Sequence, residues 1–141
     1  MIIDSGSSLL YFPDVVAEYI ANLFVPPATY NWMSNTYIVA CSARAPRVGV
    51  RIGGRSFFMS EDDLMNRGPG AVGGSSVGAG SGQCAVAVQR AQGGTLVLGD
   101  AWLNNVLVVF DLANGTDIGI GGSDRDDNGA GSVRIVGREV Y

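Results

Sequence analysis

Short apolar runs separated by glycine or polar turns make up most of this 141-residue chain. The runs are rich in valine and isoleucine, which favour strands, and some alternate with polar residues as half-buried strands do. Turn signals of the kind that join hairpin strands stand at Gly53-Gly54, Gly93-Gly94 and Asn114-Gly115. We predict strands at 2–3, 37–41, 48–52, 55–59, 84–89, 96–98 and 106–111, with a return strand through Ile118 and Ile120. The pattern predicts an all-β domain.

One stretch, residues 13–24, has apolar residues at helical spacing instead. Pro13 suits the first turn of a helix, and Asp14 is favourable at the positively polarised N-terminus. The apolar residues fall on one face, which we expect to pack against the core. This face consists of Val15, Val16, Tyr19, Ile20, Leu23 and Phe24.

Two shorter helices are expected later in the chain. Ser60 followed by Asp63 has the spacing of an N-cap with an acid at the third helical position, which predicts a helix through Leu64 and Met65. Asp100 can cap a short helix over residues 101–103.

The remaining segments are predicted to be irregular. Residues 31–35 form a polar connection around Trp32, and residues 66–83 contain seven glycines with few large apolar side chains, which predicts a mobile surface loop. Residues 123–132 are acidic and contain glycine, so we expect disorder there. A further strand is possible at Val133, Ile135 and Tyr141, but the sequence assigns it no neighbour.

The composition limits the partners and the kinds of reaction that can be expected. Hydrophobic residues make up 47% of the chain and charged residues 16%, which fits one domain with a real core. The net charge is −4, and the nine basic residues are all arginine, scattered along the sequence, so nucleic acid is not an expected partner. No apolar run is long enough to span a membrane. Without histidine or lysine, and with two cysteines, the chain lacks the groups for serine–histidine catalysis, Schiff bases or a four-cysteine zinc site.

Carboxylates and hydroxyls remain, and one stretch combines them. Asp4 follows the apolar pair Ile2-Ile3 and opens the run Asp4-Ser5-Gly6-Ser7-Ser8, in which Gly6 lets the chain bend tightly. An isolated Asp-Ser-Gly most often starts an ordinary turn. Here, however, the run continues into Leu9-Leu10-Tyr11-Phe12-Pro13, and the segments Leu96–Asp100 and Val108–Asp111 follow in order.

This ordered set of motifs resembles the C-terminal lobe of the pepsin-like aspartic proteases, especially the fungal ones, over residues 2–121. The resemblance implies one lobe of a bilobal acid protease fold, all-β with one longer helix and short helical turns. It places a catalytic lobe at residues 1–121 and a flexible extension at 122–141. The chain begins inside the active-site strand without a signal peptide, so we expect an N-terminal lobe with a substrate-covering flap to lie upstream.

The resemblance also implies a reaction and the residues that carry it. Members of the family hydrolyse peptide bonds with a water held between two aspartates that share one proton, and they need no cofactor. By resemblance Asp4 is one of these aspartates. Ser5, Gly6 and Ser7 support the active-site loop, with Ser7 aligned to a hydroxyl that binds the aspartate or the substrate backbone. Tyr11 lines a substrate subsite, and Leu98-Gly99 forms the structural prop beneath Asp4.

The family carries one disulfide where this chain has Cys41 and Cys84, and the resemblance implies the same bridge. Such a bridge would stabilise the fold by about 4 kcal/mol in the chain-entropy model and indicates a secreted or vacuolar protein. Two buried free thiols are the alternative. Asn114-Gly115-Thr116 is a possible glycosylation site.

Three functions are compatible with the sequence. The first is an aspartic endopeptidase whose substrate is a peptide or protein and whose N-terminal lobe supplies the second aspartate. No second Asp-Thr/Ser-Gly occurs in this chain, and neither Asp111 nor Asp117 has the required loop. The second is a catalytically silent pepsin-fold binding or inhibitor protein. The third is a single-lobe protein that dimerises to build a symmetric site.

Overall fold

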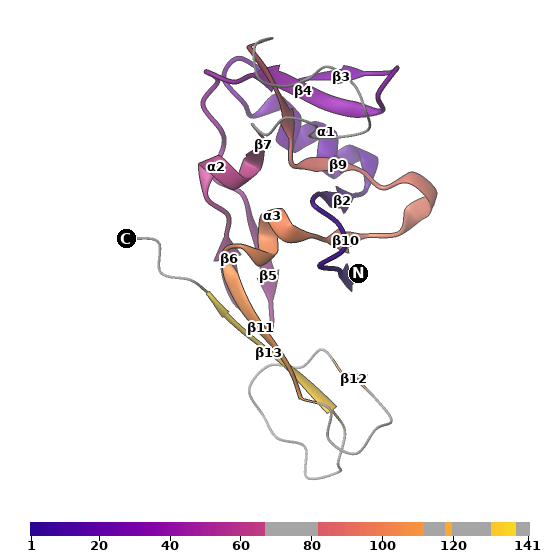
Figure 1. The fold of residues 1–141 in the computed structure, drawn as a ribbon, viewed down its shortest axis with the longest axis vertical. Helices are drawn as coiled ribbons and strands as arrows, with labels where there is room; N and C mark the ends of the chain where they lie inside the picture. Colours follow the sequence, from indigo (N-terminus) through magenta and orange to yellow (C-terminus); the bar gives the residue numbers. More distant parts are fainter. Residues whose placement is uncertain (67–81, 112–117, 120–130, 138–141) are drawn as a thin grey trace.

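The computed structural model describes residues 1–66, 82–111, 118–119 and 131–137. Within these ranges the strands form four small sheets, accompanied by three α-helices and one 3₁₀ turn. The predicted all-β lobe with one longer helix and short helical turns is confirmed. Figure 1 shows a body that contains the three helices and most strands, from which a long ribbon of two strands extends.

The sheet that carries the Asp4 loop joins segments that are far apart in sequence. Its order is β1 (Ile2–Ile3), β10 (Val97–Leu98), β2 (Leu10–Phe12) and β9 (Val88–Arg90). β10 runs parallel to β1 and antiparallel to β2, so it lies between the two strands that flank the loop. The predicted strands at 2–3 and 96–98 are confirmed, whereas β2 was not predicted.

A second sheet has the order β3 (Thr29–Asn31), β4 (Thr36–Ala40), β8 (Gln83–Val86) and β7 (Met65–Asn66). The prediction of one strand over 84–89 is wrong, because the segment divides at Ala87 and β8 and β9 join different sheets. The polar connection begins later than predicted, since Asn31 ends β3. Its side-chain Oδ1 accepts hydrogen bonds from the amides of Met33 and Ser34 at 2.9 and 3.3 Å, which closes the turn into β4.

The predicted helix is present as α1 (Asp14–Asn22), but the predicted buried face is right only for Ile20 and Phe24 and wrong for its other four residues. Val15 is 80% exposed and Tyr19 is 65% exposed, and Val16 and Leu23 are exposed as well. The helix packs against β2 and β9 through a neighbouring stripe that contains two alanines. The buried residues of this segment are Ala17, Ile20, Ala21 and Phe24. Small side chains let the helix approach the sheet closely, which leaves most of the larger apolar residues outside.

β5 (Gly49–Ile52) and β6 (Arg55–Phe58) form a separate hairpin. The turn uses Gly53 and Gly54 at φ 56° and 79°, values that favour glycine, as the sequence predicted. α2 (Glu61–Leu64) follows and is capped by Ser60, whose hydroxyl accepts from the Asp63 amide at 3.1 Å. The helix ends at Leu64 rather than Met65, because Met65 already belongs to β7.

The 3₁₀ turn η1 (Gln92–Gly94) leads through β10 into α3 (Asp100–Leu103). Asp100 is the first helical residue and not the cap as predicted, since Gly99 occupies the N-cap position without a side-chain bond. The buried Trp102 side chain meets Phe57 edge to face, with ring centroids 6.4 Å apart. The largest fully buried apolar side chains are Trp102, Phe24, Leu10, Leu64, Leu98, Val86 and Val88.

The ribbon in Figure 1 consists of β11 (Val106–Asp111) and β13 (Gly131–Gly137), paired antiparallel. The predicted return strand is wrong in its pairing: β12 (Ile118–Gly119) lies parallel to β13 and does not pair with β11. The further strand considered at Val133 and Ile135 is present as part of β13. The domain boundary at residue 121 stays a prediction.

Several predictions fall outside the described residues. These are most of the glycine-rich loop at 66–83, the acidic segment up to residue 130, Asn114 with its glycosylation motif, Ile120 and Tyr141. None of the helices in the described part is long and apolar enough to cross a membrane.

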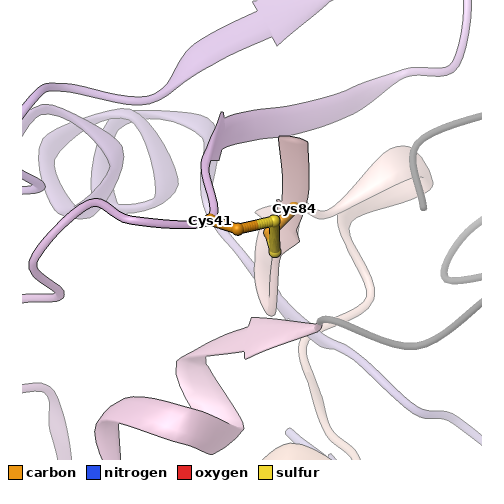
Figure 2. Close-up of a disulfide and its surroundings, with 2 residues drawn as sticks. All are labelled: Cys41 and Cys84. Carbon is orange, nitrogen blue, oxygen red and sulfur yellow. A yellow bond between two sulfur atoms is a disulfide. The ribbon is translucent and has the colours of Figure 1, made fainter. Parts of the chain in front are cut away.

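The predicted disulfide is present. Cys41 follows the end of β4 and Cys84 lies in β8, with their Cα atoms 5.0 Å apart (Figure 2). The Cys41 amide also donates to the carbonyl of Gly82 at 2.9 Å. The bridge therefore joins two neighbouring strands at one end of the second sheet.

Candidate active site

The backbone of the Asp4 loop holds its own carboxylate. The Gly6 amide donates to Asp4 Oδ1 at 2.8 Å, and the Ser7 amide donates to the Asp4 carbonyl at 3.3 Å. A Cβ at Gly6 would lie 3.1 Å from the same Oδ1, so a larger residue would crowd the carboxylate. Asp4 is partly exposed, which leaves its side chain both oriented and reachable by water.

The serines of the loop differ in their surroundings. The Ser7 hydroxyl donates to the Leu9 carbonyl at 3.3 Å, within the loop itself. Ser5 and Ser8 are exposed. The Ser7 hydroxyl therefore closes the loop by this hydrogen bond. The prediction from the sequence was that the same hydroxyl binds Asp4 or the substrate backbone.

Leu98 and Gly99 lie directly against this loop. The Asp4 amide donates to the Leu98 carbonyl at 3.0 Å, and the Asp100 amide donates to the Ser7 carbonyl at 2.7 Å. A Cβ on Gly99 would overlap the carbonyl groups of Ser7 and Leu9. Only glycine therefore fits where the chain passes between β10 and α3.

Tyr11 follows the loop in β2 and is partly buried. It stands in register between Val97 of β10 and Gln89 of β9. The same sheet thus carries Asp4, Tyr11 and the Leu98–Gly99 segment, which the sequence analysis had placed together by resemblance.

A surface pocket of about 360 Å³ opens beside the far end of the loop. It is lined by Ser8 and Leu9 of the loop, by Asp100 and Asn104, and by Asp63. The Asp63 carboxylate is already bound by the side-chain amides of Asn104 and Asn105 at 3.1 and 3.0 Å. In the described part of the chain, no three histidine, cysteine or acidic side chains are grouped so that they could hold a metal.

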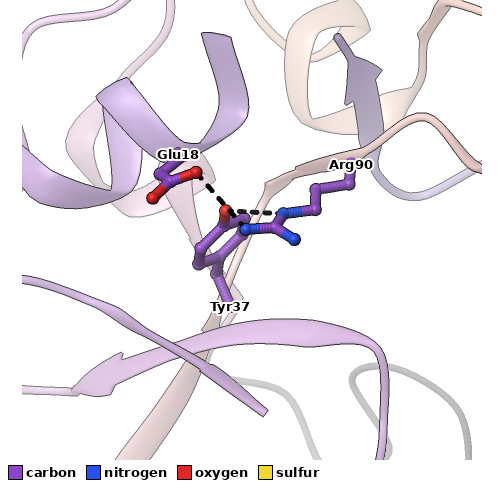
Figure 3. A network of polar contacts seen from close by, with 3 residues as sticks. All are labelled: Glu18, Tyr37 and Arg90. Carbon is purple, nitrogen blue, oxygen red and sulfur yellow. Dashed lines mark hydrogen bonds and ion pairs between the residues drawn. The ribbon is translucent and has the colours of Figure 1, made fainter. Parts of the chain in front are cut away.

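A polar network centred on β9 of the same sheet was not predicted from the sequence. Arg90 of β9 donates from Nε to the Tyr37 hydroxyl at 2.8 Å and lies 3.5 Å from the Glu18 carboxylate of α1 (Figure 3). Its guanidinium also stacks 4.3 Å from the ring centroid of Tyr30. The hydrogen bond to Tyr37 raises the pKa of Arg90, so the group stays charged. Arg90 thereby connects α1, β3 and β4 to β9.

The neighbouring Gln89 is a buried polar residue whose side-chain amide is hydrogen-bonded through both its oxygen and its nitrogen. Its Oε1 accepts from the Tyr37 amide at 2.8 Å, and its Nε2 donates to the Val86 carbonyl at 2.6 Å. A buried amide is costly unless it is hydrogen-bonded, so these bonds tie the sheet under Asp4 to β4. No sequence signal marks Gln89, because its run reads as an ordinary apolar strand.

Comparison with known proteins found a matching family and relatives of this chain. Residues 1–122 match the family described as eukaryotic aspartyl protease. A probable aspartic-type endopeptidase of Aspergillus fumigatus is 38% identical over 114 residues, which cover 79% of this chain and 25% of that protein. An acid protease of Saccharomycopsis fibuligera is 25% identical over 119 residues, covering 84% of this chain and 27% of that protein.

The chain thus spans about a quarter of the length of these two curated relatives. The family match includes the Asp4 loop, β10 and β11, and it extends over most of the chain. An oriented carboxylate on an Asp-Ser-Gly-Ser loop, underlaid by a glycine that no other residue can replace, agrees with that match. The chain belongs to the eukaryotic aspartyl protease family.

Proposed function

We propose that this chain is the C-terminal lobe of an aspartic endopeptidase and that Asp4 is one of its two catalytic aspartates. The observation that supports this most directly is the hydrogen bond from the Gly6 amide to Asp4 Oδ1, in a loop underlaid by Leu98 and Gly99. This bond fixes one oxygen of the carboxylate and leaves the other available to a water. The family membership supplies the class of reaction.

In the proposed reaction the water lies between Asp4 and a second carboxylate. The ionised carboxylate takes a proton from the water, and the water oxygen attacks the scissile carbonyl carbon. The protonated carboxyl group gives its proton to the carbonyl oxygen. The carboxyl group that took the water proton then gives it to the amide nitrogen, the C–N bond breaks, and the other carboxylate takes a proton from one hydroxyl of the intermediate. A carboxylic acid and an amine are released, and the pair of carboxyl groups again shares one proton. Two carboxylates so close share one proton most readily at acidic pH.

The second carboxylate is proposed to come from an N-terminal lobe of the same protein. The relatives are about four times as long as the matched region, which allows for such a lobe. The β11–β13 ribbon also exposes Leu107, Val109 and Val136 on one face. A nearly continuous apolar run is typical of a strand covered on both faces, so this face suits a neighbouring lobe.

The remaining residue roles belong to the same proposal. Ser5, Gly6 and Ser7 shape the loop, and Tyr11 lines a subsite for a peptide or protein substrate. The disulfide between Cys41 and Cys84 supports a secreted or vacuolar location, because such bonds persist in oxidising compartments.

The test is release of peptides from a denatured protein by the full-length enzyme. Asp4→Asn should lower the rate by about 10³-fold or more, because the variant cannot take the water proton. Asp14→Asn, an exposed acid on α1, is the matched control and should keep the parent rate. Pepstatin, an inhibitor of the family, should block the parent enzyme, and the 141-residue chain alone should be inactive from pH 2 to 7.

Two results would contradict the proposal. A rate near that of the parent in Asp4→Asn would show that Asp4 is not catalytic. A full-length protein that folds but releases no peptides under any of these conditions would favour the silent pepsin-fold binding protein.

A further inference from the structure

The arginines are concentrated in one segment of the described chain. Six of the nine lie in the described residues, and four of these six fall in residues 44–55: Arg44, Arg47, Arg51 and Arg55. All four are exposed, and no acidic residue occurs from position 44 to position 60. The β5–β6 hairpin is therefore a positively charged region in a protein whose net charge is −4.

One face of this hairpin points away from the core. Val50 and Phe57 pair across the strands and are buried, so the alternate pairs Gly49–Phe58 and Arg51–Ser56 face outward. We call the side chains of Arg47, Arg51, Ser56 and Phe58 the arginine face. Figure 1 shows the hairpin between α2 and the β11–β13 ribbon.

The arginine face is held in place by stacking. The ring of Phe58 lies over Gly49 so closely that a Cβ there would be 2.7 Å from the ring Cδ1. On the ring, the Arg47 guanidinium carbon lies 4.0 Å from the centroid. A stacked guanidinium keeps its N–H edge free, and that edge matches a carboxylate in a bidentate pair.

Neither Arg47 nor Arg51 forms an ion pair with a described residue; Arg90 does, with Glu18. Positive charges that are not paired with any described acid attract anions, and the attraction to flexible chains rises with the number of charges they present. The expected ligand is therefore an anion with more than one charge.

The hairpin also has open edges. Among the described strands, β5 and β6 pair with each other and with no third strand. Their outer edges can accept an extended peptide as a further strand. Beside the arginine face, a pocket of about 460 Å³ is lined by Arg47, Ser56 and Phe58, and on its other side by Glu61 and Asn105.

We propose that the arginine face and an adjoining strand edge bind an extended, acidic peptide segment. In an extended segment, acids at alternate positions lie on one side, where they can pair with Arg47 and Arg51. Glu61 would repel an acid that entered the pocket, so the pocket takes an apolar or neutral side chain. This surface is separate from the Asp4 loop, and the inference does not depend on peptidase activity.

Direct binding by the 141-residue chain tests the proposal. The probe is a fluorescent eight-residue peptide with glutamate at alternate positions, and the matched control has glutamine at each of them. Fluorescence anisotropy at pH 6 and low salt should show the glutamate peptide binding at least about tenfold more tightly, and 0.5 M salt should remove most of that difference. Equal binding of the two peptides would overturn the proposal.

Variants of the protein locate the site. The double variant R47Q/R51Q should lose about tenfold in affinity, because each exposed ion pair contributes up to about fivefold. The control R134Q removes an exposed arginine from β13 and should bind as the parent does. Gly49→Ala keeps every charge but displaces Phe58 and with it Arg47, so it should weaken binding by a smaller factor.

The outcomes separate the alternatives. An unchanged affinity in folded R47Q/R51Q would overturn the proposal, and so would equal losses in R47Q/R51Q and R134Q. Binding of anionic phospholipid vesicles without binding of the glutamate peptide would assign the surface to a membrane instead. Should R47Q/R51Q fail to fold, the comparison of the glutamate and glutamine peptides on the parent protein still decides the question.

Discussion

Leu98 in β10 and Leu107 in β11 both stand in runs of apolar residues, yet Leu98 is fully buried and Leu107 is 63% exposed. β10 lies inside a four-stranded sheet, with β1 on one side and β2 on the other. β11 lies at the edge of the ribbon, and its outer face has no cover among the described residues. Val136, which pairs with Leu107, is 56% exposed as well.

This difference shows that a strand can be apolar for two different reasons. The run around Leu98 is explained by this chain alone, because distant segments of the same chain enclose it. The run Val106–Phe110 has more apolar surface than the described part of the chain buries. An apolar surface of this kind most often marks an interaction site, and here the proposed occupant is the N-terminal lobe. Four predictions test this comparison, from the largest expected effect to the smallest.

The disulfide should contribute most to the enclosed part of the molecule. Replacing Cys41 and Cys84 by serine should lower the free energy of unfolding by about 4 kcal/mol, because it releases a long loop in the unfolded chain. Urea titration of the parent and the variant measures the change. A loss below about 1 kcal/mol would show that the bridge adds little to the packing around it.

The two leucines form a matched pair for the comparison itself. In the 141-residue chain, Leu98→Ala should cost about 3 kcal/mol, since it leaves a cavity under Asp4, and Leu107→Ala should cost less than about 0.5 kcal/mol. In the full-length protein the cost of Leu107→Ala should rise to about 1–2 kcal/mol if a second lobe covers it. An equally small loss of stability for Leu107→Ala in both proteins would show that a second lobe does not contact the ribbon there.

Gly99→Ala should disturb the active-site loop without removing any side chain. The new methyl group would overlap the carbonyls of Ser7 and Leu9, which are backbone atoms and cannot turn away. We expect a loss of about 2 kcal/mol in stability, and in the full-length enzyme a fall in kcat as Asp4 moves. Gly137→Ala, whose new Cβ would lie 3.5 Å from the Phe57 ring in ordinary van der Waals contact, is the control for stability with unchanged kcat.

The smallest effect is expected on the outer face of α1. Tyr19→Ser should change the free energy of unfolding by less than about 0.5 kcal/mol, because Tyr19 is exposed. Ile20→Ala, one residue further along, should cost about 2 kcal/mol or more, because Ile20 is buried. Thermal melts of the two variants compare an exposed and a buried residue of the predicted face, and similar losses would show that Tyr19 is packed as the sequence predicted.

Local signals were sufficient for many elements of the fold. The β-branched runs, the Gly53-Gly54 turn and the Ser60 cap each depend on neighbours within a few residues, so the sequence could predict them. The Asp4 loop was recognisable for the same reason, since an acid, a glycine and hydroxyls follow one another directly. Its relation to Leu98 and Gly99 came from the family resemblance, because the two segments are more than ninety positions apart.

What the sequence by itself determined is therefore the position of many of the strands, the exclusion of reactions that need histidine or lysine, and the motifs of the family. The tertiary structure decided which of several apolar surfaces is buried. α1 turned its alanines inward because close approach to β2 and β9 requires small side chains, and the run at 84–89 divided because two sheets compete for it. β13 took the place beside β11, and Arg90 and Gln89 found partners more than fifty residues away. Each of these outcomes depends on contacts between distant segments, and a hydrophobic pattern read along one segment contains no information about them.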